Sequence, residues 1–484
     1  MAGFLLGSLY LQAEVRLPAL VGDNMVLQRN ATVSLWGWAD PGAGVKVRTS
    51  WNRQTYRTRA DAEGKWLVRV ATDDAGGPYD ITIRSGNEVR LTNVLLGEVW
   101  ICAGQSNMEM PVQGYLGQPC LYAAETMRDA RLYPDIRLFT VARNSTDSPQ
   151  EDCQGAWLCP DPATVGAFSA VGYYFGRSLY QYLGVPIGLI TTNWGGTNIE
   201  AWMSEESLAK LGVDAAYREK NWDEYYFPCS VLYNGMVVPL ANYTAKGFIW
   251  YQGESNRGNA QDYAAMQVEM IRQWRELWGN EQMPFYLTQI APYRYSGGEK
   301  RRSAILVEQQ VKAAAAVPYC AMAGTTDIGT YSLIHEPDKR SVGDRLSWLA
   351  LSRDYGIPGV PADAPTYRSM EVKDGKVIVS FNNLCAPDDQ SDPRSFSWLD
   401  DAGQVIRSVK GFELAGEDRV FHPAKARLLW MDNQVELYSD EVKAPVAVRY
   451  AFCNYVETNL KTTLGQPVIP FRTDDWDIPA EEMD

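Results

Sequence analysis

Ser106 stands in the stretch of the sequence that most directly indicates chemistry. It follows an apolar run, Val-Trp-Ile-Cys-Ala at residues 99–103, from which Gly104 and Gln105 separate it. A run of this kind predicts a buried strand. Because an open α/β sheet carries its functional groups at the carboxyl ends of its strands, a serine just past Gly104 is placed to act as a nucleophile. Gly and Ser are also common turn residues, so an ordinary turn serine is the alternative.

Two further strand candidates end in clusters of amide donors. Residues 185–192 lead into Asn-Trp-Gly-Gly-Thr-Asn at 193–198, and residues 247–251 lead into Gln-Gly-Glu-Ser-Asn at 252–256. Ester hydrolysis by a serine passes through a tetrahedral oxyanion and an acyl-enzyme, and it needs preorganised hydrogen-bond donors. The two loops are the candidates to supply those donors.

The chain has two histidines, and only one of them is well placed to serve as a base. His335 comes just before an amphipathic segment with apolar residues at 342, 346, 349 and 350, which predicts a helix. His422 lies in a β-rich tail, where a structural role is expected. A serine nucleophile needs a base with a pKa near neutrality, so we predict that His335 must be uncharged and that the rate rises through about pH 6 to 7.

Four sequence blocks in order resemble the sialate O-acetylesterases, a branch of the SGNH hydrolases. The resemblance spans most of the chain, because residues 23–29 are also similar to that family's opening segment. It implies an α/β hydrolase fold and removal of acetyl groups from glycans. The blocks are Gly-Gln-Ser-Asn-Met at 104–108, Trp-Gly-Gly-Thr at 194–197, Trp-Tyr-Gln-Gly-Glu-Ser-Asn at 250–256, and Ile-His at 334–335.

The resemblance also implies roles for residues in these blocks. The oxyanion hole would consist of the backbone N–H of Ser106, the N–H of Gly195 or Gly196, and a side-chain amide from the third block. We favour Gly196 for the backbone donor. The favoured side-chain amide is Gln252 and its alternative is Asn256. The competing interpretation of either amide is that it only satisfies nearby backbone groups. Trp194 is the candidate substrate wall, and Gln105 is assigned to substrate binding.

The sequence offers three alternatives for the group that orients His335. Many relatives carry Asp two residues before the histidine, where this chain has Leu333, an apolar side chain that cannot hold an imidazolium. Glu254, in the third block, is slightly favoured. Asp327 is the second candidate, and a dyad of Ser106 and His335 held by a backbone carbonyl is the third.

Composition limits the classes of partner and cofactor. The chain has 484 residues and a formal net charge of −14, which argues against a nucleic-acid backbone as partner. Its eight cysteines form no CxxC pair and, with two histidines, offer no zinc-type spacing, so no metal and no cofactor are expected. No stretch reaches the length of a membrane span.

The amino-terminal segment predicts export. Residues 1–13 are apolar and end in a small residue, which indicates the remnant of a signal peptide and a secreted or periplasmic protein; the alternative is a native strand or a non-native extension. In an exported chain, Cys153 and Cys159 would be able to bridge a small loop.

The pattern of elements predicts three domains in the order β, α/β, β. Short alternating strands between turn signals predict a β-sandwich at 14–93, and alternating strands and helices predict a three-layer α/β/α domain with a parallel sheet at 94–357. The resemblance implies that this middle domain is SGNH-hydrolase-like. A proline-rich linker at 358–365 precedes a second β-sandwich-like domain at 366–484.

Three functions are compatible with these observations. The leading one is a serine esterase that removes O-acetyl groups from sialic acids through an acetyl-enzyme. The second keeps the mechanism and changes the sugar to acetylated xylan or another glycan. The third is a non-catalytic glycan-binding protein on an esterase scaffold, and the apolar Leu333 is the only feature that favours it.

Overall fold

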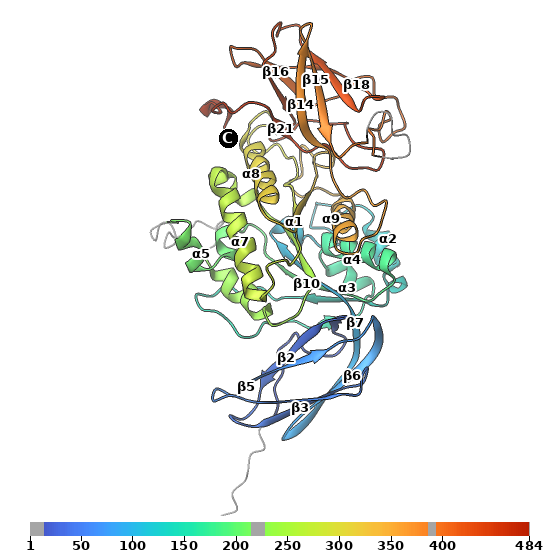
Figure 1. Ribbon diagram of the computed structural model, residues 1–484, viewed down its shortest axis with the longest axis vertical. Helices are drawn as coiled ribbons and strands as arrows, with labels where there is room; N and C mark the ends of the chain where they lie inside the picture. Colours follow the sequence, from blue (N-terminus) through green and yellow to red (C-terminus); the bar gives the residue numbers. More distant parts are fainter. Residues whose placement is uncertain (1–13, 214–227, 386–393, 484) are drawn as a thin grey trace, which may run out of the picture.

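The computed structural model describes residues 14–213, 228–385 and 394–483. Figure 1 shows three regions along the long axis, with the N-terminal strands at one end, the helices and their sheet in the middle, and the C-terminal strands at the other end. The segment predicted to be a signal-peptide remnant, residues 1–13, lies outside the described residues.

Short strands form the N-terminal region. They are β1 (Val26–Gln28), β2 (Thr32–Trp38), β3 (Gly44–Thr49), β4 (Thr55–Arg59), β5 (Lys65–Ala71), β6 (Gly76–Ser85) and β7 (Asn87–Gly104). β2 pairs with β5 in one sheet, and β3 pairs with β4 and β6 in another. Along β3 and β5 every second residue is buried, as the alternating sequence predicts for strands with one face on a core.

β7 belongs to both the N-terminal and the middle region. It has 18 residues; its first half pairs antiparallel with β6, and residues 98–104 pair parallel with a strand of the middle region. The boundary expected at 93/94 therefore falls inside one continuous strand. One hydrophobic core extends from Val33 and Val45 of the N-terminal region to Trp274 and Ile305 of the middle region.

The middle region is built on a parallel sheet. Its further strands are β8 (Ile136–Thr140), β9 (Trp157–Leu158), β10 (Ile187–Asn193), β11 (Gly247–Tyr251), β12 (Phe285–Thr288) and β13 (Cys320–Ala323). The strand order is β13-β12-β11-β7-β10-β8-β9, and every pair is parallel except that of β8 with β9. β7 lies between β10 and β11, so their carboxyl ends meet beside its own.

Helices cover both faces of this sheet. The longer ones are α4 (Ala170–Leu183), α7 (Tyr263–Trp278), α8 (Arg302–Ala316) and α9 (Lys339–Arg353). Ile101 of β7 contributes to the core that contains α7 and α8, and Trp100 contributes to the core that contains α4 and α9. Alternate residues of a strand point to opposite faces, which is why an unbroken apolar run forms this strand.

Shorter helices connect these elements. They are α1 (Ser106–Glu109), α2 (Ala123–Arg128), η1 (Ala130–Leu132), α3 (Pro162–Ala167), η2 (Ile199–Trp202), α5 (Glu205–Lys210), η3 (Tyr233–Val237), η4 (Val238–Leu240), η5 (Glu254–Asp262) and η6 (Ala480–Glu482).

Two four-stranded sheets form the C-terminal region around a separate core. Their strands are β14 (Thr366–Lys373), β15 (Lys376–Asn382), β16 (Phe412–Ala415), β17 (Phe421–Pro423), β18 (Lys425–Leu429), β19 (Gln434–Tyr438), β20 (Ala447–Tyr450) and β21 (Phe471–Arg472). Arg301, just before α8, binds Glu413 of β16 at 2.8 Å and so ties this region to the middle one. His422 pairs with Glu441 at 2.8 Å, far in sequence from the predicted site.

The predicted fold class is confirmed: a three-layer α/β/α domain with a parallel sheet, with a β region on either side. Neither Cys153 nor Cys159 is in a disulfide, so the bridge considered between them is not formed. In the described residues, no helix has both the length and the apolar composition needed to cross a bilayer.

Candidate active site

Ser106 is positioned by a backbone feature at the end of β7. Gly104 has a φ of 148°, and a Cβ placed on it would lie 2.1 Å from the carbonyl oxygen of Tyr251 on β11, so only glycine fits. Gln105 is extended, its N–H donates to the same carbonyl at 3.0 Å, and α1 then begins at Ser106. Ser106 is partly exposed between the buried residues Gln105 and Asn107. The strand end thus presents the serine side chain to solvent.

The second predicted loop packs directly on this serine. The N–H of Trp194 donates to the Gly104 carbonyl at 3.1 Å, and a Cβ on Gly195 would lie 3.1 Å from the Cβ of Ser106. The Gly195 N–H already donates to Oε2 of Glu109 at 2.8 Å, so it is not available to an oxyanion. Gly196 has a φ of 78°, and in the described part of the chain no acceptor binds its N–H. Of the two glycines, the favoured one, Gly196, retains a free backbone donor.

The side-chain amides expected in the oxyanion hole are already used within the scaffold. Nε2 of Gln252 donates to the Thr197 carbonyl at 3.0 Å and to Oδ1 of Asn256 at 2.8 Å. Nδ2 of Asn256 donates to Glu200 at 2.8 Å and to Asn259 at 3.2 Å. Both residues are buried. An amide nitrogen has two hydrogens, so neither side chain has one left for an oxyanion, and we correct the expectation accordingly.

The two residues assigned to substrate contact differ in accessibility. Gln105 is buried, and its Oε1 accepts the N–H of Gly253 at 3.1 Å, so it holds the third block in place and does not face substrate. Trp194 is partly exposed beside Ser106. The guanidinium carbon of Arg143 lies 5.1 Å from the centre of its ring, and Arg143 also pairs with Glu109. Trp194 and Arg143 therefore form one wall next to the serine.

Asn107 joins three of the four blocks. Its side chain is fully buried, and its Nδ2 donates to Oε1 of Glu254 at 2.6 Å and to the carbonyl of Ile334 at 3.2 Å. Its Oδ1 accepts from Nζ of Lys339. The residue after Ser106 thereby fixes the chain on both sides of His335.

His335 is held by an amide and not by a carboxylate. Its Nδ1 is 2.7 Å from Oε1 of Gln118, and its ring makes an edge-to-face contact with the ring of Tyr115, with centroids 5.2 Å apart. The Tyr115 hydroxyl donates to the Ser106 carbonyl at 3.2 Å, which brings the serine and the histidine to one tyrosine. No hydrogen bond joins the Ser106 hydroxyl to the His335 ring among the described residues. Such bonds are often long without substrate and tighten in the complex.

Neither predicted acid reaches His335. Within the described residues no carboxylate pairs with its ring, since the only histidine ion pair there is that of His422. Glu254 binds Asn107 instead, and Asp327 forms a two-point ion pair with Arg345, at 2.8 and 2.7 Å. The third alternative named a backbone carbonyl as the partner of His335, and the structure has the side-chain carbonyl of Gln118 at its Nδ1.

Two buried charges lie close to His335. Glu336 and Lys339 are fully buried and pair at 2.7 Å. Burial raises the pKa of the Glu336 carboxyl and of the Glu254 carboxyl. Burial of His335, assisted by the positive charge of Lys339, lowers the pKa of its imidazole to about 4.

Sequence reasoning missed Gln118, Tyr115 and Lys339. Asn107 belongs to the first block, so the sequence indicated its place near Ser106 but not its role. Gln118 and Tyr115 belong to a loop without a recognisable pattern, and no sequence signal singles them out. In the described ranges, no three side chains of His, Cys, Asp or Glu are grouped as a metal site requires.

We predict different defects for the two carboxylates. Glu254→Gln keeps an acceptor for Asn107, so kcat is expected to stay within about tenfold of wild type. Asp327→Asn leaves Arg345, 4% exposed, without its counter-ion, and it is expected to cost about 3 kcal/mol of unfolding free energy with little change in kcat. Urea unfolding and steady-state kinetics on both variants measure this. A kcat loss near 10⁴ in Glu254→Gln would restore Glu254 as the orienting acid.

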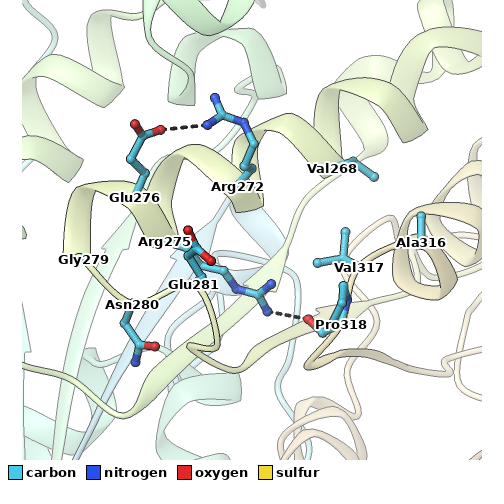
Figure 2. Close-up of a pocket in the computed structure, with 10 residues that line it drawn as sticks. All are labelled: Val268, Arg272, Arg275, Glu276, Gly279, Asn280, Glu281, Ala316, Val317 and Pro318. Atoms are coloured by element: carbon cyan, nitrogen blue, oxygen red, sulfur yellow. Dashed lines mark hydrogen bonds and ion pairs between the residues drawn. The ribbon is translucent and has the colours of Figure 1, made fainter.

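A sizeable cavity of the described chain is remote from this site. It has a volume of about 730 Å³ and lies between the carboxyl end of α7 and the connection from α8 to β13, at the amino ends of the strands (Figure 2). Arg272 there pairs with Glu276, and Arg275 donates to the Pro318 carbonyl. The candidate catalytic residues lie at the opposite edge of the sheet.

The arrangement defines the class of protein first. A three-layer α/β/α domain that presents a serine at the carboxyl end of its central strand is an SGNH-like hydrolase. A profile of the family described as "Carbohydrate esterase, sialic acid-specific acetylesterase" matches residues 96–346. The chain belongs to this family and is a carboxylic ester hydrolase.

Individual relatives agree with the family. Human sialate O-acetylesterase is 30% identical over 403 residues, which are 76% of this chain and 76% of that protein. The mouse protein of the same name is 29% identical over 419 residues, 74% of this chain and 76% of that protein. The crystal structure of a carbohydrate acetylesterase from Xanthomonas citri has a TM-score of 0.83 and 35% identity, and the match covers 96% of this chain and all of that one.

Proposed function

We propose that this chain removes O-acetyl groups from glycans by a serine mechanism with Ser106 as nucleophile and His335 as general base. Ser106 Oγ attacks the acetyl carbonyl while Nε2 of His335 takes its proton. The sugar hydroxyl then leaves with that proton, and an acetyl-enzyme remains. Water, deprotonated by the same imidazole, attacks the acetyl-enzyme. The imidazolium returns that proton to Ser106 Oγ, and the acetic acid released ionises to acetate.

One observation carries this proposal: the partly exposed Ser106 and the ring of His335 both contact Tyr115, at the carboxyl end of the central strand. The backbone N–H groups of Ser106 and Gly196 are the proposed oxyanion donors. The bond from Asn107 to the Ile334 carbonyl supports the pairing, because it joins the residues next to the nucleophile and the base.

For the sugar we propose O-acetylated sialic acid, on the support of the named relatives and of Arg143. Its side chain is 52% exposed beside Trp194 and offers a positive charge to an anionic sugar. Acetylated xylan is the second candidate, because the structural relative is named only a carbohydrate acetylesterase. Export of the chain, expected from residues 1–13, also remains a proposal.

A substrate panel tests the function. Acetate release is measured from 9-O-acetylated sialoside, 4-O-acetylated sialoside and acetylated xylan, each with Ser106→Ala as the blank. Faster acetate release from a sialoside supports the proposal. Faster release from acetylated xylan would change the proposed substrate but not the proposed mechanism. No release above the blank from any of the three would contradict the proposed function.

The pH dependence is expected to differ from that of an isolated histidine. The base must be neutral, and a lowered pKa keeps it neutral to lower pH, so kcat/KM should rise through about pH 4 and stay level up to pH 7. The charged groups near the ring are Lys339, paired with Glu336, and Glu109 with Arg143 beyond Tyr115. Initial rates on a neutral aryl acetate measure the profile. A midpoint near pH 6.5, the range expected from sequence, would show that the imidazole is not desolvated.

A further inference from the structure

A tight turn brings two side chains to the proposed catalytic pair. Tyr115 and Gln118 exchange backbone hydrogen bonds, 3.0 Å from the Tyr115 N–H and 2.9 Å from the Gln118 N–H. Gly117 between them has a φ of 74°, which a turn of this kind requires at that position. Just beyond the turn, the Leu121 N–H donates to the Pro337 carbonyl at 2.8 Å. The turn is thereby fastened to the segment that contains His335.

Each of the two side chains has its own contact with the pair. The ring of Tyr115 makes an edge-to-face contact with that of His335, and its hydroxyl donates a hydrogen bond to the Ser106 carbonyl. Gln118 places Oε1 2.7 Å from Nδ1 of His335, and no carboxylate of the described residues competes for that nitrogen. Nδ1 is the atom that the acid of a serine-protease triad contacts.

We propose that Gln118 is the positioning residue of His335 and takes the place of the triad acid. The inference rests on the proposed function. A carbonyl oxygen only accepts, so it selects the tautomer with the proton on Nδ1 and leaves Nε2 unprotonated. That is the form in which Nε2 can take the proton of Ser106. Gln118 fixes ring orientation and tautomer as a carboxylate would, but it supplies no negative charge.

The missing charge has a measurable consequence. A carboxylate beside an imidazole stabilises its charged form, whereas an amide does so only weakly. Gln118→Glu introduces that carboxylate at the same atom and is expected to move the acid limb of the pH profile upward by about one unit or more. Gln118→Met keeps a similar length and removes the acceptor.

The experiment uses the fact that the chain has only two histidines. The full chain is labelled with ¹⁵N-histidine, and His422→Gln assigns the two rings in the NMR spectrum. We expect His335 of the wild type to carry its proton on Nδ1, and Gln118→Met to show mixed tautomers. Its kcat should fall by roughly 10- to 100-fold, less than the 10⁴ lost when a triad aspartate is replaced, with KM little changed. Gln113→Met, an exposed glutamine of the same loop, is the matched control and should leave both readouts unchanged.

The outcomes separate this inference from the function on which it rests. If Ser106→Ala is inactive while Gln118→Met keeps the Nδ1 tautomer and a kcat within twofold of wild type, the role of Gln118 is wrong and the serine mechanism stands. An unmoved acid limb in Gln118→Glu would equally overturn it. If Ser106→Ala retains activity, the proposed function itself fails. The NMR readout needs no turnover, so folded but inactive variants are still informative.

Discussion

Ser106→Ala is expected to lower acetate release by a factor on the order of 10⁴ to 10⁶, because loss of a triad nucleophile removes the covalent route. Folding should be unaffected. The side chain is partly exposed, and the bond from the Tyr115 hydroxyl reaches the backbone carbonyl of residue 106, which alanine retains. Initial rates of acetate release and thermal unfolding of both proteins measure the two effects.

Covalent labelling provides an independent check on the nucleophile. An organophosphonate should label the wild type at Ser106 and should not label Ser106→Ala. Ser332→Ala is the matched control, because Ser332 is an exposed serine in the loop just before His335, and it should keep both labelling and turnover. Labelling or turnover that survives in Ser106→Ala would remove Ser106 from the mechanism.

Replacing His335 by glutamine is expected to lower kcat by a similarly large factor, about 10⁴ or more. Glutamine can still fill the space beside Tyr115 and bond to Gln118, but it cannot accept a proton near neutral pH. The other histidine cannot substitute, because His422 lies in β17 of the C-terminal region and pairs with Glu441. His422→Gln is therefore the control and should have wild-type kcat.

The two losses should not add. A nucleophile and its base act as one unit, so the double variant Ser106→Ala/His335→Gln is expected to be about as slow as either single variant. Rates of all three on the same aryl acetate test this. The assigned base would be contradicted if the double variant lost kcat by the product of the two single factors. It would also be contradicted if the kcat of His335→Gln stayed within tenfold of wild type.

The sequence by itself determined the scaffold and the edge where the site lies. The apolar run at 99–103 forms the central strand because both faces of that strand are buried. The runs that end at Asn193 and Tyr251 form its two neighbours, β10 and β11. Their carboxyl ends meet because parallel strands share a direction. Local composition determines which segments form strands and helices. Because the strands of such a sheet are parallel, the loops that follow them lie at the same, carboxyl-terminal edge.

Only the tertiary structure decided which side chain meets His335. Gln118 is 217 positions away from it in sequence, and Asn107 is 147 positions from its partner Glu254. Asp327 has the chemistry of an orienting acid, but it pairs with Arg345. The side-chain amides of Gln252 and Asn256 donate to the Thr197 carbonyl and to Glu200. A hydrogen bond depends on separations of a few tenths of an ångström and on competing partners. Residue type and spacing along the chain specify neither of these, and so the sequence predicted a candidate site but not the side chain that contacts His335.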